Sequence, residues 1–134
     1  MVITDPNILE YLHDAIVLEV TYDLKDKESR SMTLSVNCEP DAGYPAWNGK
    51  QLSIRLESVV LASFSVFGAV TGMEQINSWG TSVSEAMVSE IKRLQVAGCD
   101  CSGVRFAVVF QSGSVLEGLC QRITAEERSV PGEE

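Results

Sequence analysis

The residues best suited to chemistry are a neighbouring histidine and aspartate, His13 and Asp14, in the run ILEYLHDAIVLEVTYD. His13 is the only histidine among the 134 residues. An imidazole beside a carboxylate can act as a general base or bind a metal ion. Histidine–aspartate metal phosphohydrolases and zinc proteases need further histidines, so both are excluded. A serine or cysteine nucleophile would have His13 as its only base, and no G-x-S-x-G turn offers such a serine.

The same pair also fits a structural joint. Thr4 or Asp5 can cap a helix, the proline that follows suits its first turn, and a strand-like alternation begins at Ala15. His13 and Asp14 then fall at the end of the helix, where an imidazolium near the last carbonyls is favourable. We interpret the pair as the joint between a helix and a strand, and we predict no catalytic residue.

The cysteines predict reduced thiols. They are Cys38, Cys99, Cys101 and Cys120. A structural zinc site usually takes two close pairs, whereas this chain has one C-x-C and two single cysteines, so we expect neither a metal nor a cofactor. Zinc held by these cysteines, or by most of them with His13, is the alternative. A disulfide between Cys101 and Cys120 is disfavoured, because the expected hairpin places Cys120 opposite Arg105. Cys38 and Cys120 occupy core-facing positions.

The net charge indicates which classes of partner the chain can bind. Nineteen acidic residues against ten basic ones give a net charge of −9. Nucleic-acid binding needs clustered lysine and arginine, which this chain lacks, so a basic protein is the partner that we expect, with plain solubility as the alternative. No apolar stretch approaches the ~20 residues that span a bilayer. The N-terminus has no basic region before an apolar run, so we expect a cytoplasmic protein without membrane contact.

Hydrophobic periodicity predicts a two-layer α+β domain. The expected strands cover residues 15–23, 32–38, 51–67, 104–110 and 115–123, with a short strand or turn near residue 76. Because residues 51–67 exceed the length of an ordinary strand, we expect either two strands there or a sharp bend near residues 57–59. A capping box, Ser82-x-x-Glu85, opens one longer helix that stops at Gly98. The result is an antiparallel sheet of about five or six strands, with a short N-terminal helix and the longer helix before the C-terminal hairpin. We expect one domain over residues 1–124 and an acidic, disordered tail over residues 125–134.

The polar face of the first strands is the candidate binding surface. Its charged members are Glu19, Asp23, Arg55 and Glu57. An antiparallel sheet can also leave one face in water without any function, which is the alternative. The loop EPDAGYPAWNGK adds Tyr44 and Trp47. Aromatic residues are enriched at interfaces, so we predict that they contact a partner, unless they fold back as a lid over the core.

A family resemblance adds a function. The run YLHDAIVLEVTYD, the alternating hairpin after it, and then LSIRLESVVLASFSVFG and INSWG resemble small bacterial domains assigned as immunity proteins of polymorphic toxin systems or left as domains of unknown function. The resemblance covers residues 11–80 and carries over no functional residue. It implies a small cytoplasmic protein that binds and blocks a toxin without catalysis. The acidic charge agrees with a basic toxin.

Two other classes of function compete with the protein-binding domain. One is a small-ligand-binding or enzymatic domain with a pocket between sheet and helices, which needs buried carboxylates or His13 at a cavity. The other is a homo-oligomeric structural domain, such as a homodimer, whose edge strands pair across a twofold axis. The residues favour a non-catalytic protein-binding domain over both.

Overall fold

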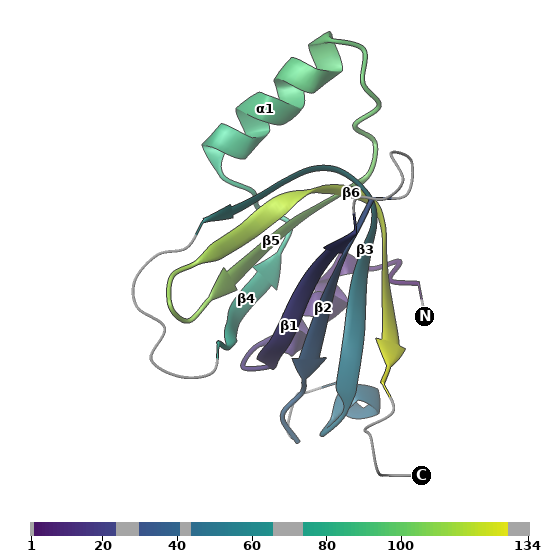
Figure 1. Ribbon diagram of the computed structural model, residues 1–134, viewed down its shortest axis with the longest axis vertical. Helices are drawn as coiled ribbons and strands as arrows, with labels where there is room; N and C mark the ends of the chain where they lie inside the picture. The colour runs from purple at the N-terminus through teal and green to yellow at the C-terminus, as the bar shows by residue number, and fades with distance from the viewer. Residues whose placement is uncertain (1, 24–29, 41–43, 66–73, 129–134) are drawn as a thin grey trace.

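The computed structural model describes residues 2–23, 30–40, 44–65 and 74–128, and it contains a six-stranded antiparallel sheet in the order β1-β2-β3-β6-β5-β4 (Figure 1). The elements in chain order are η1 (Pro6–Leu12), β1 (Ile16–Asp23), β2 (Ser31–Asn37), η2 (Pro45–Trp47), β3 (Gln51–Ser65), β4 (Ile76–Gly80), α1 (Glu85–Val96), β5 (Val104–Phe110) and β6 (Val115–Glu127). The predicted α+β class is confirmed, with one helix before the final hairpin. The expected N-terminal helix is a 3₁₀ helix.

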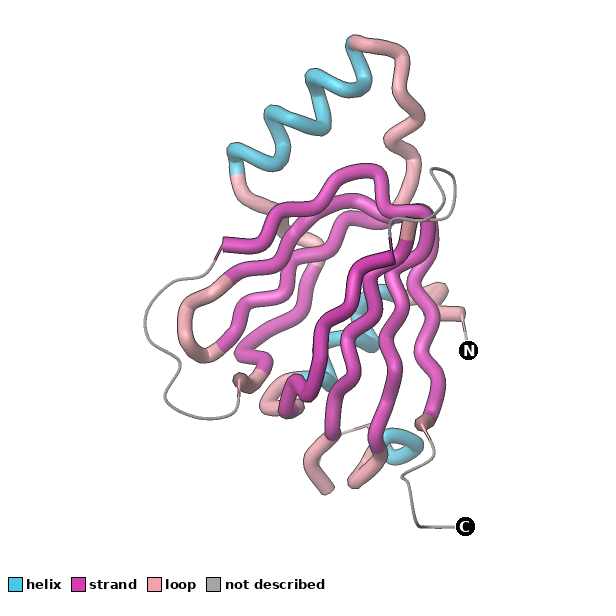
Figure 2. Tube along the Cα trace, viewed as in Figure 1, coloured by secondary structure: helices cyan, strands magenta, loops and turns pink. Residues whose placement is uncertain are grey.

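The two longest strands, β3 and β6, bend together and fold the sheet over (Figure 2). A bulge interrupts their register between Val59 and Leu61, and Ser58 has a φ of 52°. Bulges bend a strand and increase its twist, so the predicted bend near residues 57–59 is confirmed. Gly118 of β6 lies in the same region, where an added Cβ would stand 2.0 Å from the backbone oxygen of Leu61. A side chain at this position would therefore force the two strands apart.

The two outer strands of the sheet, β1 and β4, meet at one end within the described residues. Ile16 forms an isolated antiparallel bridge with Gln75. The amide of Ile76 donates to the carbonyl of Ala15 at 3.0 Å, and that of Val17 donates to the carbonyl of Glu74 at 2.9 Å. The sheet thus closes partly on itself, and the contact of Val17 with Glu74 is the last of this junction in the part of the chain that the structure describes.

The core lies inside the folded sheet and is covered at one side by η1. Leu9 and Leu12 of η1 are buried there with Trp79 of β4. A smaller apolar cluster joins Met87 and Ile91 of α1 to Leu119 of β6, so α1 packs outside the bend of the sheet (Figure 1). The described part of the chain has no helix of the length and apolar character that crossing a membrane requires.

Two predicted boundaries differ from the structure. The cap of α1 is Ser84, not Ser82, and its hydroxyl accepts from the amide of Met87 at 3.2 Å. Glu117 of β6 accepts hydrogen bonds from both the amide and the hydroxyl of Ser84, which holds the start of the helix against the sheet. Strand β6 continues to Glu127, because it pairs with β3 beyond the expected start of the tail. The expected disorder of residues 129–134 lies outside the described residues.

Candidate functional site

The apolar side chains of β1 are only partly covered. Leu18, Val20 and Tyr22 are 46%, 42% and 43% exposed. Val20 lies directly opposite Leu34 of β2, and Leu34 is fully buried. Because opposite residues of an antiparallel pair share a face, the apolar face of the sheet continues from the core into solvent at β1. We call Leu18, Val20 and Tyr22 the β1 apolar stripe.

The backbone of β1 is also open on one side. β1 is the first strand in the sheet order, with β2 on its inner edge. On its outer edge the last backbone contact within the described ranges is that of Val17 with Glu74. Residues 18–22 therefore present the outward half of their amides and carbonyls without a neighbouring strand in the part of the chain that the structure describes. An outer edge of this kind is a template for another chain.

The opposite face of β1 continues into a polar face that runs over four strands. Its cross-strand rows are Glu19–Ser35–Ser53–Glu126, Thr21–Thr33–Arg55–Thr124 and Asp23–Ser31–Glu57–Arg122. The structure thus brings the predicted residues Glu19, Asp23, Arg55 and Glu57 onto one face. Their role in binding stays a prediction.

Glu57 organises the charges of this polar face. Arg122 Nε donates to Glu57 Oε2 at 2.6 Å, its Nη2 pairs with the same oxygen, and Arg55 Nε lies 3.9 Å from Glu57 Oε1. Two guanidinium groups are therefore directed at one carboxylate. Among the described residues, Glu19 and Glu126 form no ion pair. A polar depression of about 460 Å³ lies beside Arg55, Glu57 and Arg122. Arg128 Nη1 donates to Ser35 Oγ at 2.7 Å, so the Glu19 row holds one guanidinium beside the carboxylates of Glu19 and Glu126 and keeps an excess of negative charge.

Tyr44 and Trp47 lie elsewhere. Trp47 is 5% exposed and belongs to the core. The half-buried Tyr44 ring stands edge-on to the Trp47 ring, with 4.7 Å between the ring centroids. The other side of Tyr44 stacks on Tyr11 of η1 at 5.9 Å. This arrangement fits the lid alternative, because the aromatic side chains cover the end of the core. The structure does not bring them to the polar face, which lies on the side of the sheet away from the core.

His13 and Asp14 form the joint between η1 and β1. Asp14 adopts a φ of 69°, which turns the chain out of the 3₁₀ helix, and its amide donates to the carbonyl of Ile76 at 2.7 Å. Its Oδ1 accepts from Gln111 Nε2 at 3.0 Å, and its Oδ2 lies 3.1 Å from Nδ1 of His13. More than half of the His13 side chain is exposed. Asp14 thus lies between η1 and β1, as the joint interpretation predicts, and it also contacts β4 and the turn after β5.

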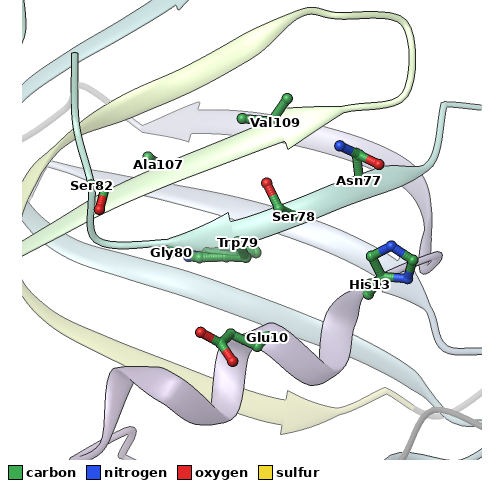
Figure 3. A pocket seen from close by; sticks show the side chains of 9 residues that line it. All are labelled: Glu10, His13, Asn77, Ser78, Trp79, Gly80, Ser82, Ala107 and Val109. Atoms are coloured by element: carbon green, nitrogen blue, oxygen red, sulfur yellow. The ribbon is translucent and has the colours of Figure 1, made fainter.

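His13 also lines a groove between η1 and β4 (Figure 3). The groove has a volume of about 360 Å³, and its lining residues are Glu10, His13, Asn77, Ser78, Trp79, Gly80, Ser82, Ala107 and Val109. Figure 3 shows Glu10 and His13 projecting from η1 on the side of β4. The indole nitrogen of Trp79 is buried and has no hydrogen-bond partner. A carboxylate, an imidazole and hydroxyl groups around apolar side chains suit a small polar ligand.

The four cysteines form no disulfide. Burial raises the pKa of the Cys38 thiol to about 11, and burial also raises that of Cys120 to about 12. Both thiols are therefore protonated and unreactive near neutral pH, as expected for core positions. Cys120 lies opposite Val104, whereas the expected hairpin placed it opposite Arg105, the next residue of β5. Within the described ranges no group of three or more His, Cys, Asp or Glu side chains is placed to hold a metal ion.

Comparison of the chain with protein-family models, curated proteins and solved structures found no match. Functional argument therefore rests on the surfaces described above. Reasoning from the sequence missed two of their features. It did not identify the exposure of Leu18, Val20 and Tyr22, and it did not include Arg122 in the polar face. The regular alternation of the final strand was the available signal for Arg122.

Proposed function

We propose that this chain is a non-catalytic protein-binding domain that contacts its partner through β1 and the polar face beside it. One observation carries the proposal: Leu18, Val20 and Tyr22 are each more than 40% exposed on an outer strand. Exposed apolar groups on an open strand edge favour association with another polypeptide. The pairing of open edges with extended segments is a common mode of protein recognition.

The absence of protective features on β1 supports the proposal. Proteins commonly guard an outer strand with lysine, proline, a bulge or a very short length. β1 has eight residues, IVLEVTYD, and contains neither lysine nor proline. Its register shift lies between Val17 and Glu19, at the start of the strand. Apart from the carboxylates of Glu19 and Asp23, the remainder of the strand carries no such guard.

The finer proposal is that the partner is a basic toxin that the domain blocks, as an immunity protein does. The net charge of −9 supports a basic partner, since opposite charges speed association and improve complementarity. Glu19 and Glu126 add carboxylates without ion-pair partners beside the β1 apolar stripe. A bacterial origin and a cytoplasmic location belong to this finer proposal.

The test is capture of partners from the native cells by the tagged chain and by two lysine variants. Val20→Lys places a charge in the β1 apolar stripe, whereas Val96→Lys makes the same change on α1, where Val96 is 90% exposed. We expect wild type and Val96→Lys to retain one stoichiometric protein that Val20→Lys loses. Melting curves of both variants check that they fold. Retention of that protein by a folded Val20→Lys variant would place the interface elsewhere.

Self-association through β1 is distinguished in the same samples. Sedimentation of the purified chain measures its mass in solution. If the wild-type chain is a dimer and the Val20→Lys variant is a monomer, the partner at β1 is a second copy of the chain and not a different protein.

A second candidate function is small-ligand binding in the groove between η1 and β4. The supporting observation is the position of Glu10 and His13 at a cavity that Trp79 also lines. The indole N–H of Trp79 is buried and has no hydrogen-bond partner, and a buried donor without an acceptor costs about 1–3 kcal/mol. Native mass spectrometry of the protein from its own cells tests this. A retained small molecule that a Glu10→Gln variant loses would support the groove.

A further inference from the structure

We infer that β1 accepts an extended segment of a partner protein as an additional strand, and that this segment alternates apolar and basic side chains. The inference rests on the proposed function and specifies the chemistry of the partner. Three properties of β1 carry it: an open backbone edge, an exposed apolar stripe on one face and, on the other, a carboxylate that forms no ion pair with a described residue.

The backbone supplies the mode of binding. Residues 18–22 continue a hydrogen-bonded ladder with β2, so their backbone is already extended. In such a strand, half of the amides and carbonyls point to the outer edge. An added strand would lie about 4.8 Å away and pair with these groups. Ordering costs fall only on the incoming segment, because β1 is held by β2.

The apolar stripe sets the side chains on one face of that segment. Val20 and Tyr22 lie beside the buried Leu34 and Met32 of β2, yet both are more than 40% exposed. An added strand places its side chains about 4.5–5.5 Å from those of its neighbour on the same face. Apolar residues at alternate positions would therefore cover the stripe and extend the core by one strand.

Glu19 sets the charge on the other face. It lies opposite Ser35, in a row that continues to Ser53 and Glu126. Arg55 and Arg122 are directed at Glu57, and Arg128 Nη1 donates to Ser35 Oγ at 2.7 Å. The Glu19 row therefore holds two carboxylates, those of Glu19 and Glu126, and one guanidinium, and among the described residues neither carboxylate forms an ion pair. A lysine or arginine of the added strand beside Glu19 would meet the excess negative charge of this row, which favours a basic segment over an acidic one.

A second copy of the chain fits this edge less well. In an antiparallel self-pair centred on Val20, Glu19 would lie opposite Thr21. The two copies of Glu19 would then be diagonal neighbours, about 7–8 Å apart. Like charges at this separation oppose pairing at low salt, whereas a basic segment gains from the same carboxylate.

The probes are capped, fluorescently labelled peptides of about ten residues, long enough to cover the open part of β1. The first alternates valine and lysine. The second replaces every lysine with glutamate. The third is the valine–lysine peptide with two consecutive central residues N-methylated, which removes donors from both backbone edges. Fluorescence anisotropy at low ionic strength measures their affinity for the full chain.

We expect the valine–lysine peptide to bind about tenfold or more tightly than the glutamate peptide. N-methylation should weaken binding about tenfold, because it removes backbone pairing and keeps the side chains. Val20→Lys should abolish binding, Val96→Lys should leave it unchanged, and Glu19→Gln should weaken it about two- to fivefold, an effect that added salt reduces.

Equal binding of the lysine and glutamate peptides would overturn the basic specificity. Equal binding of the N-methylated peptide, or no binding of the valine–lysine peptide at about 1 mM, would overturn strand addition. These failures differ from a failure of the proposed function. If Val20→Lys still releases the captured protein while the peptides fail, β1 is an interface of another kind. If the Val20→Lys variant still captures the protein and still binds the peptides as the wild type does, both proposals are wrong.

Discussion

The partial exposure of β1 predicts a contrast between two valines that receive the same substitution. Val20 of β1 is 42% exposed, whereas Val36 of β2 is fully buried and packs in the core. Replacing valine with threonine keeps the shape and the β-branched side chain but exchanges a methyl group for a hydroxyl. The two variants therefore report how much water each side chain reaches.

The expected costs differ severalfold. At Val36 the hydroxyl enters an apolar site, and burying such a group without a partner costs about 1–3 kcal/mol. At Val20 the hydroxyl reaches solvent, and surface substitutions usually stay within about 0.5 kcal/mol. We therefore expect Val36→Thr to lower the free energy of unfolding by about 2 kcal/mol and Val20→Thr to change it by about 0.5 kcal/mol or less.

Urea unfolding, followed by tryptophan fluorescence and by circular dichroism, measures both costs. The midpoints are comparable if the slopes agree among the three proteins. A loss of about 2 kcal/mol or more for Val20→Thr, equal to that of Val36→Thr, would refute the reasoning. It would mean that Val20 is covered in solution and that β1 has no free apolar face.

Three further predictions address the fold, the thiols and the joint. Gly118→Ala should destabilise the protein by about 3 kcal/mol, because the added Cβ would stand 2.0 Å from a backbone oxygen. The control Gly80→Ala, whose added Cβ has nothing within 4 Å, should change the free energy of unfolding by about 1 kcal/mol or less. Similar unfolding midpoints for the two variants would contradict the close approach of β3 and β6. At pH 8 a chromogenic disulfide reagent should modify the exposed Cys99 in the native protein and reach Cys120 only on unfolding, because burial raises the Cys120 pKa to about 12. Rapid labelling of Cys120 in the native protein, located by peptide mapping, would contradict the burial of this thiol. His13→Gln should change the free energy of unfolding by about 1 kcal/mol or less and partner affinity by about threefold or less, and complete loss of binding by the folded variant would overturn the joint interpretation.

Local patterns in the sequence predicted most of the elements. Strict alternation located β1 and β2, and the change of period after Leu12 located the joint at His13 and Asp14. These features depend on residues that are close in the chain, and backbone geometry acts at the same range. The bend of β3 was predictable because its apolar phase exceeds the length of an ordinary strand.

The candidate site was less predictable because it depends on contacts between distant segments. Alternation identifies an apolar face of β1 but not whether another layer covers Val20, and that depends on the sheet order. The burial of Trp47 depends on how η2 folds back onto the core, which its loop sequence leaves open. The cap at Ser84 depends on Glu117, which comes 33 residues later in the chain. In each case tertiary contacts decide the outcome.

Hydrogen exchange of the chain, alone and in complex with the captured partner, tests the central claim most directly. Because the outer edge of β1 has no described strand beside residues 18–22, the outward amides of these residues should exchange rapidly in the free protein. Binding through β1 predicts strong protection of these amides in the complex and little change over α1. Unchanged exchange of residues 18–22, with protection at α1 or at the groove between η1 and β4, would contradict the claim.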